Sequence, residues 1–328
     1  MLIHWIWLAH RPGVSDRMKV RLLQHFREPE DIYFADGESY RHVEGMTAEA
    51  AEALGDKDLS ASEAALEACR REGLHILTFR DAAYPSKLKN IADPPILLYY
   101  KGQLPDLDAL PVIGVVGTRK ASPYGLHTAK LMAAPIGVCG GLVVSGAAFG
   151  IDTAAMEGAL DAEAPVIGVL GGGVDVVYPA ANRPLYRRTE KKGCLISEYP
   201  PGTRPYPGQF LQRNRIISGL SDGVLVVEAP TKSGALNTAR HAFSQGRDMF
   251  VVPGNLGVDS CQGSNGLLQE GAYAALSGWD VVKHYAPLYP GAVENRPAPM
   301  IQRMETSLPR VAEKPKLPRK QEEQNVSS

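Results

Sequence analysis

The sequence has no excess of charge of either sign and contains little cysteine. It carries 35 Lys and Arg against 36 Asp and Glu, so the overall basicity of many nucleic-acid-binding proteins is missing, and any such function must rest on a local patch. The four cysteines (Cys69, Cys139, Cys194, Cys261) lie far apart and form no C-x-x-C pair, which argues against a metal site or a disulfide framework. Reduced thiols of this kind indicate a cytoplasmic protein.

Long hydrophobic runs are also missing. The apolar start, Met1–Ala9, is too short to cross a bilayer, and no basic segment precedes it. We therefore expect a buried first helix there rather than a signal peptide, and no membrane contact.

The length of 328 residues suffices for about two domains, and the composition changes twice along the chain. Residues 1–72 are predicted to form a small all-helical N-terminal domain, in which Ser60 and Glu63 have the spacing of a capping box. The segment 43–48 resembles the turn of a helix-hairpin-helix module, although a plain connection between two helices is the simpler alternative. Residues 287–328, rich in proline and charge, are predicted to be a disordered C-terminal tail.

Between these two parts, residues 73–286 alternate short β-rich runs with helical stretches. Several runs are apolar on both faces, as is typical of buried parallel strands. This alternation, with short glycine-rich turns, predicts a doubly wound, Rossmann-like α/β fold with a mostly parallel sheet. The predicted strands are His75–Phe79, Ile96–Tyr100, Val112–Val116, Leu142–Ser145, Val166–Leu170, Cys194–Ser197, Val224–Val227 and Met249–Val252. The predicted helices are Tyr124–Ala134, Thr153–Ala159, Pro184–Lys192, Leu236–Ser244 and Asn265–Glu270.

The first of four glycine-rich turns contains Gly117, Thr118 and Arg119. It is not a G-x-G-x-x-G dinucleotide fingerprint, and 133–141 holds no acidic residue for a ribose, so no dinucleotide cofactor is predicted. A tight turn at a helix N-terminus still favours an anion. Arg119 could pair bidentately with phosphate, or it could form a salt bridge to a neighbouring loop.

The second and third turns have less specific interpretations. Ser145 and Gly146 begin a small-residue turn, and Asp152 is expected to be the N-cap of the following helix rather than a catalytic acid. In the third turn, the run Gly171, Gly172 and Gly173 suits either an anion nest or a purely steric role in a sharp turn.

The fourth turn is the most informative part of the chain. The run 210–240 contains Phe210, the cluster Arg213-Asn214-Arg215 and a small-residue loop, Lys232-Ser233-Gly234. An aromatic ring can stack on a base while arginines neutralise the adjacent phosphates, so these residue types suit a polynucleotide. The alternatives are core packing for the phenylalanine and, for the arginines, ion pairs with Glu198 or Glu228.

These segments together resemble the DNA-processing protein A family (DprA, also called Smf). The resemblance covers about residues 85–285 and rests on G-T-R-x-x-S-x-Y-G, S-G-x-A-x-G-I-D, G-G-G-x-D-x-x-Y-P-x-x-N, R-N-R-I-I-S-G-L-S, S-G-A-L-x-T-A-R and V-P-G. It implies a sterile-alpha-motif-like or helix-hairpin-helix-like N-terminal domain. It also implies a cytoplasmic, dimeric, non-catalytic protein that binds and protects single-stranded DNA and helps load RecA recombinase in natural transformation.

Carried over by motif, the DNA-binding residues are expected to be Arg119, Phe210, Arg213, Asn214, Arg215 and, with weaker support, Lys232. The loops expected to contact phosphate contain Gly117, Thr118, Ser145, Gly146, Gly171, Gly172, Gly173, Ser233 and Gly234.

The sequence also departs from the family pattern. Pro207-Gly208-Gln209 stands where family members often carry a basic residue, and Leu211 replaces a proline. Many members end in a winged-helix-like module, whereas this sequence stops in a proline- and charge-rich segment, so either the module is naturally missing or the chain has been cut. Two other functions stay open: a nucleotide-binding phosphoribohydrolase and a mononucleotide sensor. The enzyme is disfavoured because His241 occupies the position of the catalytic glutamate in the related P-G-G-x-G-T-x-x-E loop.

Overall fold

The computed structural model describes residues 1–293 and confirms the predicted α/β fold. A nine-stranded, mostly parallel sheet runs through this part of the chain in the order β1-β2-β6-β5-β4-β3-β7-β8-β9. The strands are β1 (His75–Thr78), β2 (Leu97–Gly102), β3 (Val112–Val116), β4 (Leu142–Ser145), β5 (Val166–Val169), β6 (Cys194–Ser197), β7 (Gly223–Val226), β8 (Asp248–Val251) and β9 (Tyr273–Ala274).

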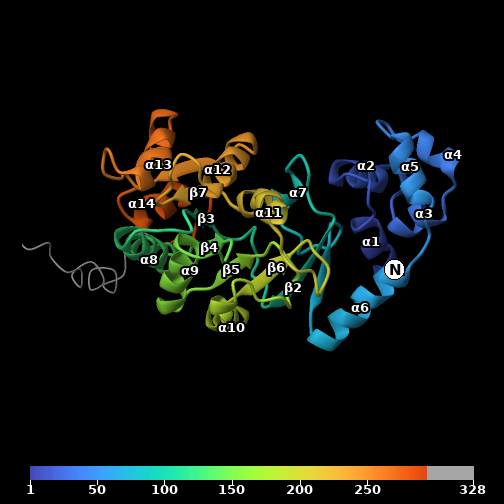
Figure 1. Ribbon diagram of the computed structural model, residues 1–328, viewed down its shortest axis with the longest axis horizontal. Helices are drawn as coiled ribbons and strands as arrows, with labels where there is room; N and C mark the ends of the chain where they lie inside the picture. The colour runs from blue at the N-terminus through green and yellow to red at the C-terminus, as the bar shows by residue number, and fades with distance from the viewer. Residues whose placement is uncertain (294–328) are drawn as a thin grey trace, which may run out of the picture.

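The helices fall into an N-terminal group and a group between the strands (Figure 1). The N-terminal helices are α1 (Leu2–Ala9), α2 (Asp16–Phe26), α3 (Pro29–Phe34), α4 (Gly37–Arg41), α5 (Ala48–Gly55) and α6 (Ser60–Glu72). The later ones are α7 (Ser86–Lys89), α8 (Pro123–Val138), α9 (Ile151–Asp161), α10 (Arg183–Lys192), α11 (Pro207–Leu220), α12 (Gly234–Ser244), α13 (Asp259–Gln269) and α14 (Gly278–Val282), with 3₁₀ turns η1 (Ala180–Asn182) and η2 (Lys283–Tyr285).

The order of the strands creates a crevice at one edge of the sheet. From β3 the chain winds outward through β4, β5 and β6, and each neighbouring pair is parallel. It then returns through α11 and adds β7 and β8 on the other side of β3. The connections after β3 and β7 therefore diverge at the carboxyl edge of the sheet, which is where doubly wound proteins bind ligands. β1 and β2 pair antiparallel and extend the sheet beyond β6.

Helices cover both faces of the sheet (Figure 1). α8 and α9 place Met132 and Met156 in the core on one face, while α11 and α12 place Ile217 and Ala239 in the core on the other. Strand residues 112–116 are accordingly buried and apolar without alternation, because both of their faces lie under helices.

The helices α1–α6 form a lobe beside the β1–β2 end of the sheet (Figure 1). His10 lies 3.0 Å from the hydroxyl of Tyr99 on β2, and burial lowers the pKa of His10 to about 4, so a neutral ring makes this contact. Arg80 also donates to Glu28 of the lobe at 3.1 Å. The lobe is therefore tied to the sheet by polar contacts as well as by the shared apolar core.

Details of the lobe modify the sequence predictions. α1 is a buried helix, as expected. The capping-box prediction for Ser60 is wrong: α6 begins at Ser60, its N-cap is Leu59, and the Ser60 hydroxyl donates to Asp58. The segment 43–48 connects α4 to α5, and the Arg21 guanidinium occupies the space beside Gly45.

The eight predicted strands all occur, but β9 and the helices α7, α11 and α14 were not predicted. The prediction of disorder is wrong for 287–293, because the Tyr289 hydroxyl donates to Asp222 at 2.8 Å and Val293 is buried in the core. The rest of the predicted tail lies outside the described residues. No helix among residues 1–293 has the length and apolarity needed to cross a membrane.

Candidate nucleic-acid interface

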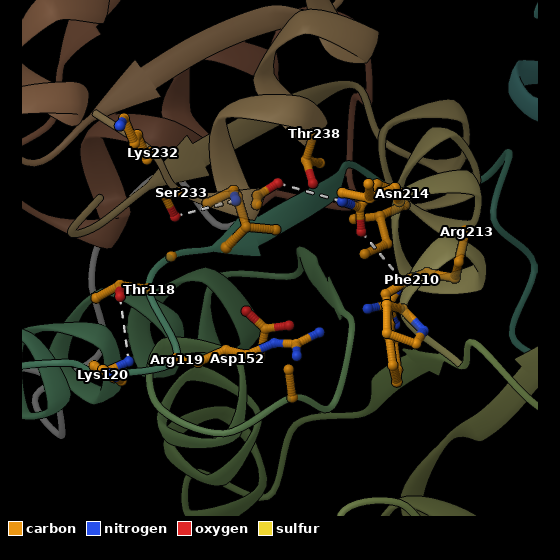
Figure 2. Close-up of a pocket in the computed structure, with 18 of the residues that line it drawn as sticks. Thr118, Arg119, Lys120, Asp152, Phe210, Arg213, Asn214, Lys232, Ser233 and Thr238 are labelled. Atoms are coloured by element: carbon orange, nitrogen blue, oxygen red, sulfur yellow. Dashed lines mark hydrogen bonds between the residues drawn. The ribbon is translucent and has the colours of Figure 1, made fainter. Parts of the chain in front are cut away.

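A pocket of about 570 Å³ opens at the carboxyl edge of the sheet. Its walls are the loop 116–120 after β3, the loop 230–235 after β7 and the first half of α11. Figure 2 shows labelled side chains from these three segments, together with Asp152 of α9, around the same hollow. The crevice expected from the strand order is thus present as a pocket at this edge.

The start of α11 determines which side chains reach the pocket. Pro207 occupies the first turn, where its missing N–H costs nothing, and the Gln209 side chain accepts from the Tyr206 N–H at 2.9 Å. From this start, Phe210 and Arg213 lie three residues apart on one helix face and both line the pocket.

An aromatic and cationic cluster forms the rim. The Arg119 guanidinium lies 4.7 Å from the ring centroid of Phe210, and the ring of Tyr178 lies 5.5 Å from the same ring. Phe210 is half-buried because its ring packs on Gly171, where a Cβ atom would come within 2.8 Å of it. Tyr178 is 48% exposed. Phe210 therefore packs against a glycine turn and also faces the pocket, and its role in base stacking stays a prediction.

Arg213 lines the pocket but is held by the protein. It is only 3% exposed, and it donates to the backbone carbonyl of Gly146 at 2.7 Å and to that of Val169. Gly146 must lack a side chain here, because a Cβ atom would lie 2.4 Å from the Arg213 guanidinium. Burial lowers the pKa of Arg213.

Asp152 has a different role from the one predicted. The N-cap prediction is wrong: α9 begins at Ile151 after Gly150, and the Asp152 carboxylate reaches back to accept from the Gly146 N–H at 3.2 Å. Burial raises the pKa of Asp152 to about 6, although the positive charges of Arg213 and Arg119 oppose the shift. It is the acidic residue that lines the pocket.

The α12 side of the pocket is joined to α11 through Asn214. Its side-chain amide donates to the carbonyl of Gly234 at 3.3 Å and to the side chain of Asn237 at 3.2 Å. The Ser233 hydroxyl accepts from the Ala235 N–H at 3.2 Å and caps α12. The small-residue loop is thus fixed in place, with Ser233 and Gly234 on the wall of the pocket.

Three exposed cations surround the pocket: Arg119, Lys120 and Lys232. Within residues 1–293 none of these side chains forms a salt bridge, so the alternative of a structural ion pair for Arg119 is not observed. Thr118 orders the turn between them by accepting from the Lys120 N–H at 3.2 Å. Lys120 was not predicted as a site residue, although its position next to Arg119 in the same glycine turn could have indicated it.

Arg215 does not line the pocket. It is 2% exposed and donates to Glu198 at 2.7 Å and to Asp16 of the helical lobe at 2.8 Å, with Asp93 at 3.3 Å. Burial alone would lower the pKa of Arg215, but these carboxylates outweigh it and hold the pKa above its ordinary value. The structural ion pair with Glu198 is therefore observed.

The triple-glycine turn is closed to a ligand by the segment 200–205. The Gly173 N–H donates to the Thr203 carbonyl at 2.9 Å, and a Cβ atom at Gly172 would lie 2.8 Å from the same oxygen. The steric interpretation of this turn is supported, and the anion nest is not.

Packing and hydrogen bonding within the protein also account for Gly117 and Ser145. Gly117 lines the pocket, but a Cβ atom there would lie 2.4 Å from the Ile151 side chain. The Ser145 hydroxyl is fully buried and donates to the Val115 carbonyl at 2.6 Å. Ser145 therefore supports the sheet edge without reaching the pocket.

The other acids considered for catalysis are already engaged. Glu198 pairs with Arg215, Glu228 accepts from the Ser122 N–H at 3.0 Å, and Asp175 accepts from the Gly202 N–H at 2.9 Å. None of the three, nor His241, lines the pocket. In the described part of the chain, no cluster of His, Cys, Asp and Glu could hold a metal ion.

Fold and site together define a Rossmann-like protein with a cationic, aromatic-rimmed pocket at the switch point of a doubly wound sheet. The chain belongs to the DNA processing protein A (DprA/Smf) family: the family model described as DNA recombination-mediator protein A matches residues 75–286. This confirms the resemblance seen in the sequence.

Individual relatives agree with this assignment. Protein Smf of Synechocystis sp. is 36% identical over 278 residues, which are 84% of this chain and 70% of that protein. DNA processing protein DprA of Bacillus subtilis is 41% identical over 216 residues, 66% of this chain and 73% of that one.

Two solved structures share the fold. DprA from Streptococcus pneumoniae superposes with a TM-score of 0.75 at 32% identity and covers 86% of this chain and 98% of its own. DNA processing protein A from Helicobacter pylori, in a study of its single-stranded DNA binding mode, gives a TM-score of 0.59 at 30% identity and covers 66% of this chain and 97% of its own.

Proposed function

We propose that this protein binds single-stranded DNA in the pocket at the carboxyl edge of the sheet and acts without catalysis as a recombination mediator. The observation that carries the proposal is the grouping of Arg119, Lys120 and Lys232, without salt bridges, around a pocket that Phe210 and Tyr178 border. The 30% identical DNA processing protein A of Helicobacter pylori, whose structure comes from a study of its single-stranded DNA binding mode, supports it.

The charges of the site suit a polyanion. The three exposed cations are free to meet phosphates, and Arg213 adds a fourth positive charge from below, with Asp152 as the opposing charge. Each phosphate neutralised releases counterions, so binding should weaken steeply with salt, by a log–log slope near −0.7 per contact for a single strand.

The aromatic rings favour a single strand over a duplex. A base can stack on an exposed ring such as Tyr178 only when it is not already stacked and paired inside a duplex. Stacking also tolerates every base, because each has a π-face, so no sharp sequence preference is expected.

Fluorescence anisotropy with labelled oligo-dT, blunt duplex and a mononucleotide mixture tests the proposal. We expect the tightest binding for oligo-dT, and Arg119→Ala should weaken it while leaving duplex binding low. Equal or tighter binding of the blunt duplex would contradict the proposal, and tight binding of mononucleotides alone would favour a nucleotide sensor.

The physiological role proposed here is protection of incoming DNA in the cytoplasm and transfer of that DNA to the RecA recombinase in natural transformation, by a homodimer. It rests on membership of the recombination-mediator family. Sedimentation at increasing protein concentration tests the dimer. A RecA-filament assay on DNA coated with single-strand-binding protein tests loading, which should fail with Arg119→Ala.

One observation keeps a hydrolase as the second candidate. A carboxyl whose pKa is raised to about 6 inside a pocket has a property of a general acid or base, and Asp152 is such a group. Release of free base from nucleoside monophosphates, lost in Asp152→Asn, would support this activity.

A further inference from the structure

The outward face of α10 carries a row of basic side chains. Arg183, Arg187 and Lys191 follow one another at intervals of four residues and are all exposed. Leu185 and Tyr186 of the same helix are buried in the core. Successive members of the row are about 6 Å apart along the helix axis, since each residue rises about 1.5 Å.

The row differs from the other cations of the same helix by having no partners. Arg188 pairs with Asp161 at 2.7 Å, and Lys192 pairs with Glu163. Within residues 1–293, by contrast, no ion pair or hydrogen bond engages the side chains of Arg183, Arg187 and Lys191. Two of the five basic side chains are therefore neutralised in place and three remain available to an external anion.

The row begins at the rim of the pocket. Tyr178 lines the pocket, and the hydroxyl of Tyr186 on α10 donates to the Tyr178 carbonyl at 2.9 Å. Asn182, directly before α10, donates to the Ala147 carbonyl at 2.9 Å and to the Thr153 hydroxyl at 2.8 Å. These bonds hold the first turn of α10 in a fixed position beside the pocket.

We propose that a DNA strand leaving the pocket passes Tyr178 and continues along α10, with its phosphates paired to Arg183, Arg187 and Lys191. This path rests on the proposed function and extends it by a second contact surface for the same strand. Three observations carry it: the uncompensated charge of the row, its regular spacing, and its continuity with the aromatic rim of the pocket.

The path makes binding depend on oligonucleotide length. An oligo-dT of about six nucleotides can fill the pocket alone, whereas one of about 20 can also reach the row, in keeping with site sizes of about 4–16 nucleotides for comparable single-strand sites. Anisotropy should be measured on both lengths with the full chain and with two double variants.

The test variant is Arg187→Ala with Lys191→Ala, and its control is Arg188→Ala with Lys192→Ala. Both change the net charge of the same helix by the same amount, but the test variant removes unpaired cations and the control removes cations that are paired with Asp161 and Glu163. We expect the test variant to lose on the order of tenfold to a hundredfold in affinity for the long oligo-dT, and its salt slope to flatten by about 1.4, or 0.7 per lost contact. The short oligo-dT should bind as before, and the control should lose less on either length.

Wild-type affinity and salt slope of the test variant on the long oligo-dT would overturn the path and leave the pocket intact. Equal losses on both lengths, or equal losses in test and control variants, would also overturn it, since overall charge would then explain the effect. Failure of the unmodified protein to bind either oligonucleotide would contradict the proposed function itself. Unchanged melting temperatures would show that both variants are folded.

Discussion

Arg119 and Arg213 both line the pocket, but replacing Arg213 should mainly lower stability, whereas replacing Arg119 should mainly weaken DNA binding. In Arg213→Ala, the carbonyls of Gly146 and Val169 lose a buried donor, and Asp152 loses a positive charge that opposes its burial. Removing one member of a buried charged network costs about 3–5 kcal/mol. At roughly 2–4 °C per kcal/mol for a domain of about 200 residues, the melting temperature should fall by about 6–20 °C.

Arg119→Ala removes an exposed side chain that forms a cation–π contact with the ring of Phe210. An exposed cation–π contact is worth about 0.5–1 kcal/mol, so the melting temperature should fall by no more than a few degrees. The DNA, however, loses a charge-assisted contact worth about 1.5–3 kcal/mol, or roughly 10-fold to 150-fold in affinity.

The assay combines thermal denaturation with anisotropy on oligo-dT for the two variants in parallel. If Arg213→Ala melts like the unmodified protein, the buried network contributes little and the reasoning from burial is refuted. If Arg119→Ala binds DNA normally, the exposed cations of the rim are not a phosphate site. Arg119→Lys is the matched control, because it keeps the charge and loses only the planar fork.

Three further outcomes follow from the geometry. Phe210→Leu should weaken oligo-dT binding by roughly 1–3 kcal/mol with an unchanged salt slope, since a stacking surface is lost and no phosphate contact is; a flatter slope would contradict this. The pKa of Asp152 is raised from 3.8 to about 6, so its contribution to stability is present below about pH 4 and is lost as the pH rises through 6. Asp152→Asn should therefore gain melting temperature relative to the unmodified protein between pH 4 and pH 7, and an equal difference at both pH values would exclude the shift. Arg215→Ala should cost about 3–5 kcal/mol because it removes a buried guanidinium and leaves the mostly buried Glu198 without its ion pair, whereas Asp16→Asn should cost less; equal melting temperatures for Arg215→Ala and the unmodified protein would contradict the network.

The parallel strands could be predicted because burial on both faces requires a continuous apolar run, and a buried strand is the simplest explanation of such a run. Residues 112–116 are such a run, and the structure places them at the centre of the sheet. β9 was not predicted, because it is only two residues long and both are exposed. The antiparallel pairing of β1 and β2 at one edge has no signature in local composition.

α11 escaped prediction for a physical reason. Its polar residues Gln209, Arg213, Asn214 and Arg215 are buried along with its apolar ones, so the helix shows no polar face opposite an apolar one. Without the helix, the directions of its side chains could not be assigned. Residues two apart on a helix point about 200° away from each other, which sends Arg213 to the pocket and Arg215 to the lobe.

The run R-N-R thus looks like one motif, but its two arginines lie in different environments and have different partners. The first arginine belongs to the glycine turn under the pocket, and the second belongs to an acidic cluster that includes Asp16 of the helical lobe. In relatives in which the acid at position 16 is replaced, the second arginine loses one of its partners and is less constrained, while the first arginine keeps its carbonyl partners and stays. Paired substitution at positions 16 and 215, without change at 213, is the pattern that a comparison of many such sequences should reveal.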